Sequence, residues 1–261
     1  GFSYDIMANR KEVSSYSRSD AVSFGRDSEY SAIPGVLTFG GNNYRNTFTY
    51  GTQVITDKRL REQWSKNIGG IESWTGTGWT GQPLIVHWPA ETLQWMNVKE
   101  EFKSKEGGLT EVVYPAMDGV IYFLELETGS ITRDPLSTGV VQKGTACIDP
   151  RGYPLLFVGQ GIPAANDEGN HAAYLRVFSL LDGKVLAEFG GFDYFGNRQW
   201  QAYDGSPIVS GDTIVYGGEN GILYTRKLNA SFDPATGALS MEPEQFVKYR
   251  YKGAGYSKDD A

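Results

Sequence analysis

The stretch from Gly205 to Asn229, GSPIVSGDTIVYGGENGILYTRKLN, constrains the fold of this chain most strongly. A glycine opens a short apolar run, Gly211-Asp212 marks a turn, and a segment with alternating side-chain character follows. Asn220-Gly221 then precedes a return strand. Because both residues of this pair tolerate positive φ, we expect a type I′ hairpin turn there. The stretch therefore predicts three consecutive antiparallel strands.

Two looser copies of the pattern lie upstream, one around the turn Asp118-Gly119, where we also expect type I′ geometry, and one over residues 153–184. Each copy follows a strand opened by a glycine, with 63 residues from Gly81 to Gly144 and 61 from Gly144 to Gly205. A repeat of four short strands is the unit of a β-propeller blade. The period predicts an all-β fold, a partial β-propeller of four-stranded blades with about three full blades. A β-sandwich with meander hairpins is the alternative.

Three segments, DGVIYFLELETG, YLRVFSLLDGK and ENGILYTRKLN, resemble the pyrroloquinoline-quinone-like propeller repeats. Each has a turn or strand start, an aromatic strand and a following turn, and the resemblance covers about residues 64–251. The third copy departs from the pattern, because its Thr-Gly pair is displaced to Thr236-Gly237. The resemblance implies a propeller fold and an address outside the cytoplasm.

The composition excludes some classes of partner. The net charge of −7 and a pI near 5.0 argue against a nucleic-acid surface, which needs a basic stripe. No apolar run approaches the roughly 18 residues that a membrane helix needs. The single cysteine, Cys147, lies in an apolar strand, where we expect it to pack in the core. Gly1 in place of an initiator Met suggests a processed start. With a leader presumed removed, we expect an extracellular or cell-surface protein.

Two regions are expected along the chain: an extended N-terminal lead-in over residues 1–35 and the partial propeller over 36–261. Within the second region we expect a strand near 36–39 and an outermost strand over 60–68. Pro89 to Phe102 predicts a short helical insertion between the first two strands of a blade. This insertion would cover a strand edge or, alternatively, dock a partner.

Three repeats are fewer than the 4–8 blades that typically close a propeller ring. We therefore expect a second polypeptide, or a second copy of this chain, to supply further blades. The N-terminal strand would complete the last blade.

The chemistry-bearing residues predict no catalytic centre. His87 and His171 lie in different repeats, and no G-x-S-x-G motif is present. Quinone-dependent dehydrogenases of the related propeller class use a vicinal disulfide, a stacked Trp and Ca²⁺. Cys147 has no neighbouring cysteine, so we expect no cofactor. The polar loop Gly161 to Ala173 is either solvated or a cation site.

In a propeller, the loops that lead into the innermost strands and the middle hairpin loops emerge on one face, near the axis. We expect a ligand site there, which could stack a sugar or a peptide, although Trp79 and Trp200 could instead brace adjacent blades. The expected ligand-binding residues are Trp74, Trp79, Gln82, Lys143, Trp200, Tyr203 and Asp204.

The expected function is an exported binding module, without catalytic activity, for a protein or a surface polymer. An enzyme acting on carbohydrate through two axial carboxylates is the alternative, and a structural spacer is a third reading. A closely spaced carboxylate pair would favour the enzyme, an aromatic face poor in carboxylates the binder, and a filled axis the spacer.

Overall fold

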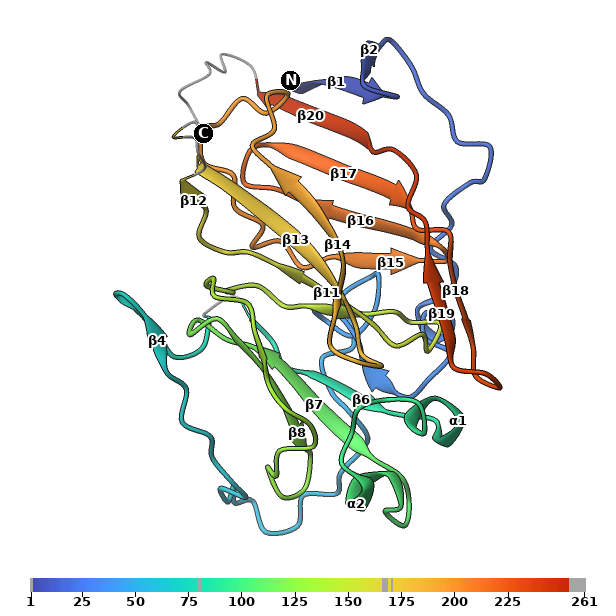
Figure 1. Ribbon diagram of the computed structural model, residues 1–261, viewed down its shortest axis with the longest axis vertical. Helices are drawn as coiled ribbons and strands as arrows, with labels where there is room; N and C mark the ends of the chain where they lie inside the picture. Colours follow the sequence, from blue (N-terminus) through green and yellow to red (C-terminus); the bar gives the residue numbers. More distant parts are fainter. Residues whose placement is uncertain (1, 79–80, 166–168, 170, 254–261) are drawn as a thin grey trace.

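The computed structural model describes residues 2–78, 81–165, 169 and 171–253, and within them the all-β prediction is confirmed. Three antiparallel sheets follow one another along the chain and along the long axis of the molecule (Figure 1). The first sheet has the order β3 (Gly35–Val36), β6 (Leu84–His87), β7 (Thr110–Pro115), β8 (Val120–Glu125), β9 (Leu136–Ser137).

The second sheet consists of β10 (Cys147–Ile148), β11 (Leu155–Gly159), β13 (His171–Ser179) and β14 (Val185–Gly191), with β12 (Ala164–Ala165) also paired to β13. The third has the order β15 (Ile208–Ser210), β16 (Thr213–Gly217), β17 (Ile222–Lys227), β20 (Val247–Gly253), β1 (Phe2–Ala8), β2 (Lys11–Val13). Two further hairpins lie outside the sheets, β4 (Gly70–Ile71) with β5 (Trp74–Thr75), and β18 (Ala230–Asp233) with β19 (Ala238–Met241). Each expected repeat therefore corresponds to one sheet.

Strands β6, β10 and β15 are the strands that follow the opening glycines. In each of them, successive side chains point to opposite faces of the sheet. In β6, Leu84 points into the core between the first and second sheets. In β10, Ile148 points back into that core, while Cys147 points into the core between the second and third sheets. Val209 of β15 also points into the second core. The repeats thus stack in one direction, and two apolar cores hold the three sheets together.

Residues 36–38 contact all three sheets, at β6, at β10 and at the residue before β15. Val36 pairs with Ile85 of β6, and the Leu37 carbonyl accepts a hydrogen bond of 2.9 Å from the amide of Ile148. The Thr38 hydroxyl donates to the carbonyl of Pro207, immediately before β15, at 2.8 Å. Val36, Leu37 and Thr38 are buried. The junction of the three sheets is therefore filled by the chain itself. The strand expected over 36–39 is shorter and begins at Gly35.

The recurrence of glycine before β6 and β10 has a steric cause. A Cβ atom on Gly144 would lie 2.3 Å from the carbonyl oxygen of Asp204, and one on Gly81 would lie 3.0 Å from that of Lys143. Lys143 and Asp204 each precede the glycine that opens the next sheet. At each junction the backbone of the next repeat passes too close for a side chain, so the repeat requires glycine at this position.

The expected helical insertion lies between β6 and β7. It forms two single-turn helices, α1 (Ala90–Leu93) and α2 (Glu100–Lys103). Leu93 and Met96 join the core between the first two sheets. Pro89 precedes α1 with φ −60° and ψ 140°, so it occupies the N-cap rather than the first helical position.

The lead-in contains the expected N-terminal strand, which joins the third sheet. Strand β1 pairs with β20 over its whole length, and the Asp5 carboxylate lies 2.5 Å from the Arg250 guanidinium. Residues 14–26 then cross the third sheet as an irregular strap, with no regular element before the 3-10 turn η1 (Asp27–Glu29).

Two local expectations are wrong. Residues 60–68 form no strand. They run as irregular chain in which Trp64 donates a hydrogen bond to the Leu126 carbonyl. Asp118 and Asn220 do not have positive φ, so their turns are not type I′. Gly119 and Gly221 do have positive φ, at 74° and 79°, and the hydrogen bond from the Gly221 amide to the Gly218 carbonyl closes a type I turn. A glycine at positive φ after such a turn is typical of three-residue hairpin loops.

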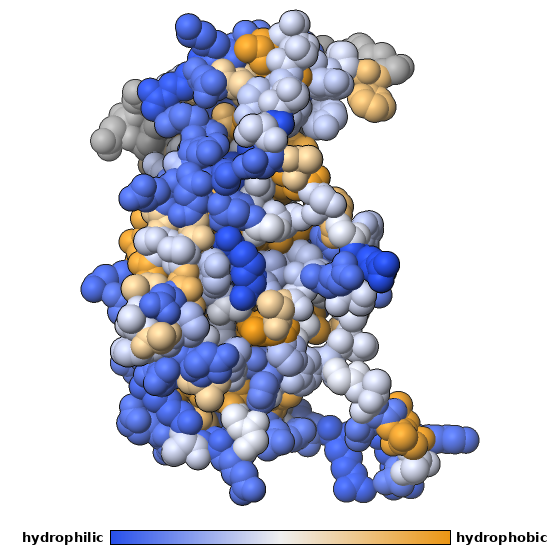
Figure 2. All heavy atoms as spheres, turned by 90° about the vertical axis from the view of Figure 1, so that its right-hand side faces the viewer, coloured by the Kyte–Doolittle hydropathy of each residue, from blue (hydrophilic) through white to orange (hydrophobic). Residues whose placement is uncertain are grey.

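The irregular segment from residue 48 to residue 60 carries exposed hydrophobic side chains, among them Val54, Ile55 and Leu60. Figure 2 shows a hydrophobic group set apart from the body at the lower end of the molecule, where this segment runs. No helix in the described ranges is long and apolar enough to cross a membrane.

Candidate functional site

The loops that lead into β10 and β15 meet the β4–β5 hairpin and form one polar site, which we call the Lys143–Asp204 site. The Lys143 ammonium lies 2.8 Å from a carboxylate oxygen of Asp204, and both side chains are largely shielded from water. The same ammonium lies 5.5 Å from the centre of the Trp74 ring, a distance suited to a cation–π contact. Three of the expected ligand-binding residues are therefore neighbours.

The Asp204 carboxyl lies in an environment that disfavours its charged form. Burial raises its pKa to about 6, against the lowering effect of the Lys143 ammonium, and the nearby Glu219 carboxyl adds to the rise. In addition, Asp204 Oδ1 is buried and accepts no hydrogen bond of regular geometry from the described residues.

Residues from two further loops enclose the pair. Glu219 lies in the β16–β17 loop, where its amide donates to the Ala202 carbonyl at 2.9 Å and its carboxylate lies 3.8 Å from the Arg198 guanidinium. Gly161 covers the pair so closely that a Cβ atom there would lie 2.6 Å from Asp204 Oδ1. Glu219 was not among the expected residues, although its place beside the Asn220-Gly221 turn was the available signal.

The other expected residues have different surroundings. Gln82 accepts a hydrogen bond from the Gly40 amide at 3.0 Å, and its own amide donates to the Thr145 hydroxyl at 2.8 Å. It therefore ties the junction segment to the loop before β10. Tyr203 is buried, with its ring centre 5.5 Å from that of Tyr216, so it belongs to the core.

Trp200 packs against His171, with 5.7 Å between the ring centres, in agreement with a bracing role. Trp79 lies outside the described residues, as do Asn166, Asp167, Glu168 and Asn170 of the loop weighed as a cation site. Among the described residues, no group of three or more His, Cys, Asp or Glu side chains is placed to hold a metal ion.

No protein-family model matches the chain, and no curated protein matches it. Among solved structures, the chain is similar to the crystal structure of BamB from Moraxella catarrhalis, with 13% sequence identity and a TM-score of 0.23. The match covers 66% of this chain and 62% of that one, so the chain spans less than two thirds of the length of its structural neighbour. A TM-score this low does not assign a fold, so the architecture rests on the strand order and packing described above.

Proposed function

We propose that this chain is an exported or cell-surface β-propeller module of the pyrroloquinoline-quinone-like repeat type, which binds a protein or a surface polymer and has no catalytic activity. In this proposal the three sheets are blades, a second polypeptide or second copy supplies further blades, and the ligand binds at the Lys143–Asp204 site.

The observation that carries the proposal is the buried oxygen Oδ1 of Asp204. A buried acceptor without a donor destabilises a protein by about 1–3 kcal/mol. Gly161 covers this oxygen, so a hydroxyl or amide donor from a ligand reaches it when the loop of Gly161 moves aside. The Trp74 ring beside it is only half-buried and offers an apolar face. A hydroxyl donor next to an apolar face describes a sugar ring, so we favour a carbohydrate surface polymer as the ligand.

Two other functions are the alternatives. Glycosidases hold their two carboxyls roughly 5 Å or more apart, with the glycosidic bond between them. The neighbouring carboxyls of Asp204 and Glu219 favour this alternative, but Asp204 is bound to the Lys143 ammonium at 2.8 Å. The filled junction at residues 36–38 favours a spacer, but a spacer gives no reason to keep Asp204 Oδ1 unpaired.

An array of neutral and acidic bacterial and plant polysaccharides provides the test. We expect selective binding that Trp74→Ala and Asp204→Asn each weaken at least tenfold. Trp95→Ala serves as the matched control, because Trp95 is exposed and hydrogen-bonded to Pro234 beside α1. Absence of binding to any probe, or an equal loss in the Trp95 variant, would overturn the proposal. Release of reducing sugar from a bound polysaccharide would instead support the enzyme.

A further inference from the structure

The outer faces of the first and third sheets are of opposite type. Irregular chain rather than another sheet covers each of them, so that Val112, Leu124, Ile208 and Thr225 are buried. On the first sheet, Ile85, Val112 and Leu124 stand side by side on paired strands and point away from the second sheet. Ile148, Leu156 and Phe178 hold the corresponding register in the second sheet, and all three are buried in the core against the first. The outward face of the first sheet therefore corresponds to the face that the second sheet packs against the first.

The third sheet presents the opposite face. Ile208, Val215 and Thr225 are paired across β15, β16 and β17 and point away from the second sheet. The corresponding residues of the second sheet, Cys147, Phe157 and Val177, are completely buried in the core against the third sheet. The third sheet therefore carries the kind of face against which the next sheet in a stack packs.

Irregular chain covers both faces incompletely. Over the first sheet, the segment 64–68 leaves an apolar pocket of about 390 Å³ between Trp64 and the strands, lined also by Val112 and Leu124. Over the third sheet, the strap 17–24 leaves a pocket of about 770 Å³ that reaches Val215 and Thr225. Protein interiors are close-packed, so pockets of this size on apolar sheet faces indicate surfaces that lack their natural packing partner.

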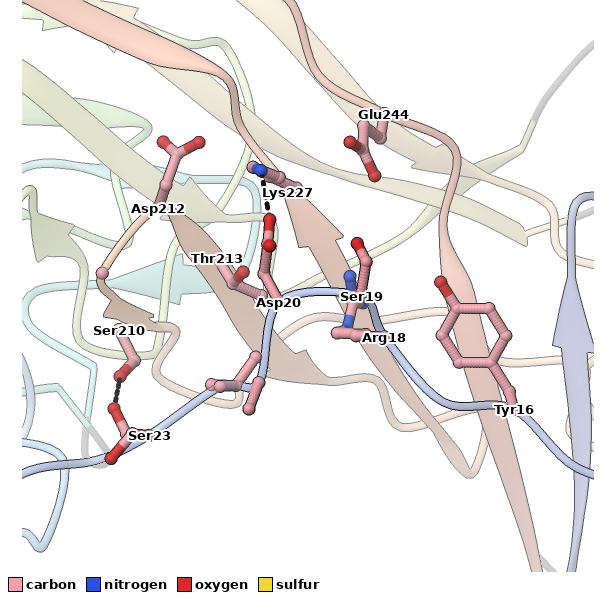
Figure 3. A pocket seen from close by; sticks show the side chains of 13 residues that line it. Tyr16, Arg18, Ser19, Asp20, Ser23, Ser210, Asp212, Thr213, Lys227 and Glu244 are labelled. Carbon is pink, nitrogen blue, oxygen red and sulfur yellow. Dashed lines mark hydrogen bonds and ion pairs between the residues drawn. The ribbon is translucent and has the colours of Figure 1, made fainter.

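Polar contacts hold the strap over the third sheet, among them a hydrogen bond from the Arg18 guanidinium to the Thr225 hydroxyl. Figure 3 shows the end of this region, where the Asp20 carboxylate lies 2.6 Å from the Lys227 ammonium and the Ser210 hydroxyl donates to the Ser23 carbonyl at 2.9 Å. A polar pocket of about 340 Å³ separates the strap from the β15–β16 turn beside these contacts. An ion pair this exposed contributes little, whereas displacing the strap breaks the hydrogen bonds of Arg18 and Ser210 and exposes the buried side chains beneath it.

The strand-opening glycine of the third sheet has different surroundings from the other two. Gly81 and Gly144 each lie against the backbone of the following repeat, whereas the nearest atoms to a Cβ on Gly205 belong to Gly217 of its own sheet. Among the described residues, no following repeat lies against Gly205.

We infer that the outer face of the third sheet docks on the outer face of the first sheet of a second copy of this chain. The contact is head to tail. The third sheet of the second copy makes the same contact with the first sheet of the first copy, so that two copies close a ring of six sheets. This rests on the proposed function in taking the sheets as propeller blades. Six lies within the 4–8 blades of closed propellers, and a contact between unlike faces forms a ring when its rotation closes.

Sedimentation velocity on the whole chain tests the inference with three matched substitutions. Val112→Lys places a charge on the outer face of the first sheet, Val215→Lys on that of the third sheet, and Val185→Lys at an exposed position of β14 away from both. We expect the unmodified chain and Val185→Lys to be dimers. Val112→Lys and Val215→Lys, each alone, should raise the dimer dissociation constant at least 100-fold, because every head-to-tail contact then contains one altered face.

An equimolar mixture of Val112→Lys and Val215→Lys should recover a dimer, since that pair retains one contact between two unaltered faces. An unmodified chain that stays monomeric at about 100 μM, or a mixture that does not associate, overturns the inference. Should a Lys variant fail to fold, hydrogen exchange of the unmodified chain decides. Protection of β7, β8, β16 and β17 must rise with concentration, and constant protection overturns the inference. Monomers that still bind a polysaccharide would refute this inference and leave the proposed function standing.

Discussion

Lys143 and Asp204 hold equivalent positions in consecutive repeats, each one residue before the glycine that opens its sheet, and their charged groups lie 2.8 Å apart. The ion pair therefore links the second sheet to the third at the end where the connecting loops emerge. Burial nevertheless holds the pKa of Asp204 above its ordinary value. The link between repeats is thus sensitive to pH.

Stability should depend on the protonation of Asp204. Its pKa is about 6 in the folded chain against 3.8 for the free side chain, so the folded state binds the proton more tightly. The resulting stabilisation is complete below pH 4 and is lost as the pH rises to 6. Relative to Asp204→Asn, the unfolding free energy of the unmodified chain should fall by up to about 1.4 kcal/mol per pH unit in this window. Urea titrations from pH 4 to 7 measure the difference, and parallel curves would refute the assignment.

Gly144→Ala should destabilise the chain through steric overlap. The added methyl group would lie 2.3 Å from the Asp204 carbonyl oxygen, and backbone must shift to admit it. We expect a loss of about 1–3 kcal/mol in unfolding free energy. Gly217→Ala is the control, because a Cβ atom there meets no atom within 4 Å. Equal melting temperatures for the two variants would contradict the close approach.

The buried ion pair of Glu111 and Arg133 should be costly to break, and Glu111 also accepts hydrogen bonds from the Trp88 indole and the Thr132 hydroxyl. Their charged groups lie 2.6 Å apart, both side chains are almost completely buried, and Arg133 also donates to the Leu180 carbonyl. Arg133→Met alone leaves a buried carboxylate and should reduce the unfolding free energy by about 3–5 kcal/mol. The double variant with Glu111→Leu should be more stable than Arg133→Met. A double-mutant cycle with purely additive losses would show that the two residues do not act as a pair.

Gly221→Val should weaken the β16–β17 hairpin, because Gly221 has φ 79° and a β-branched residue resists positive φ. The expected loss is about 1–3 kcal/mol. Gly221→Asn should lose less, since Asn tolerates this conformation better. Thermal unfolding monitored by circular dichroism ranks the variants, and a valine variant as stable as the asparagine variant would argue against the observed turn.

Part of the candidate site was predicted from the positions of its residues within the repeats. Trp74, Lys143 and Asp204 were expected together because equivalent loops of a repeat emerge at the same end, and the structure brings them together. Glu219 was missed as part of it. Its role depends on how far the β16–β17 loop reaches toward the neighbouring sheet, and loop paths are not encoded in a strand pattern.

The sequence by itself determined the three repeats and the strands and turns that define them, because side-chain alternation and turn glycines are local properties of the chain. Only the tertiary structure decided that β1 pairs with β20 and that residues 35–38 fill the junction of the sheets. Those pairings join residues up to 251 positions apart, as in the pair of Phe2 and Gly253. Their choice depends on which edges and faces remain uncovered after the local elements have formed.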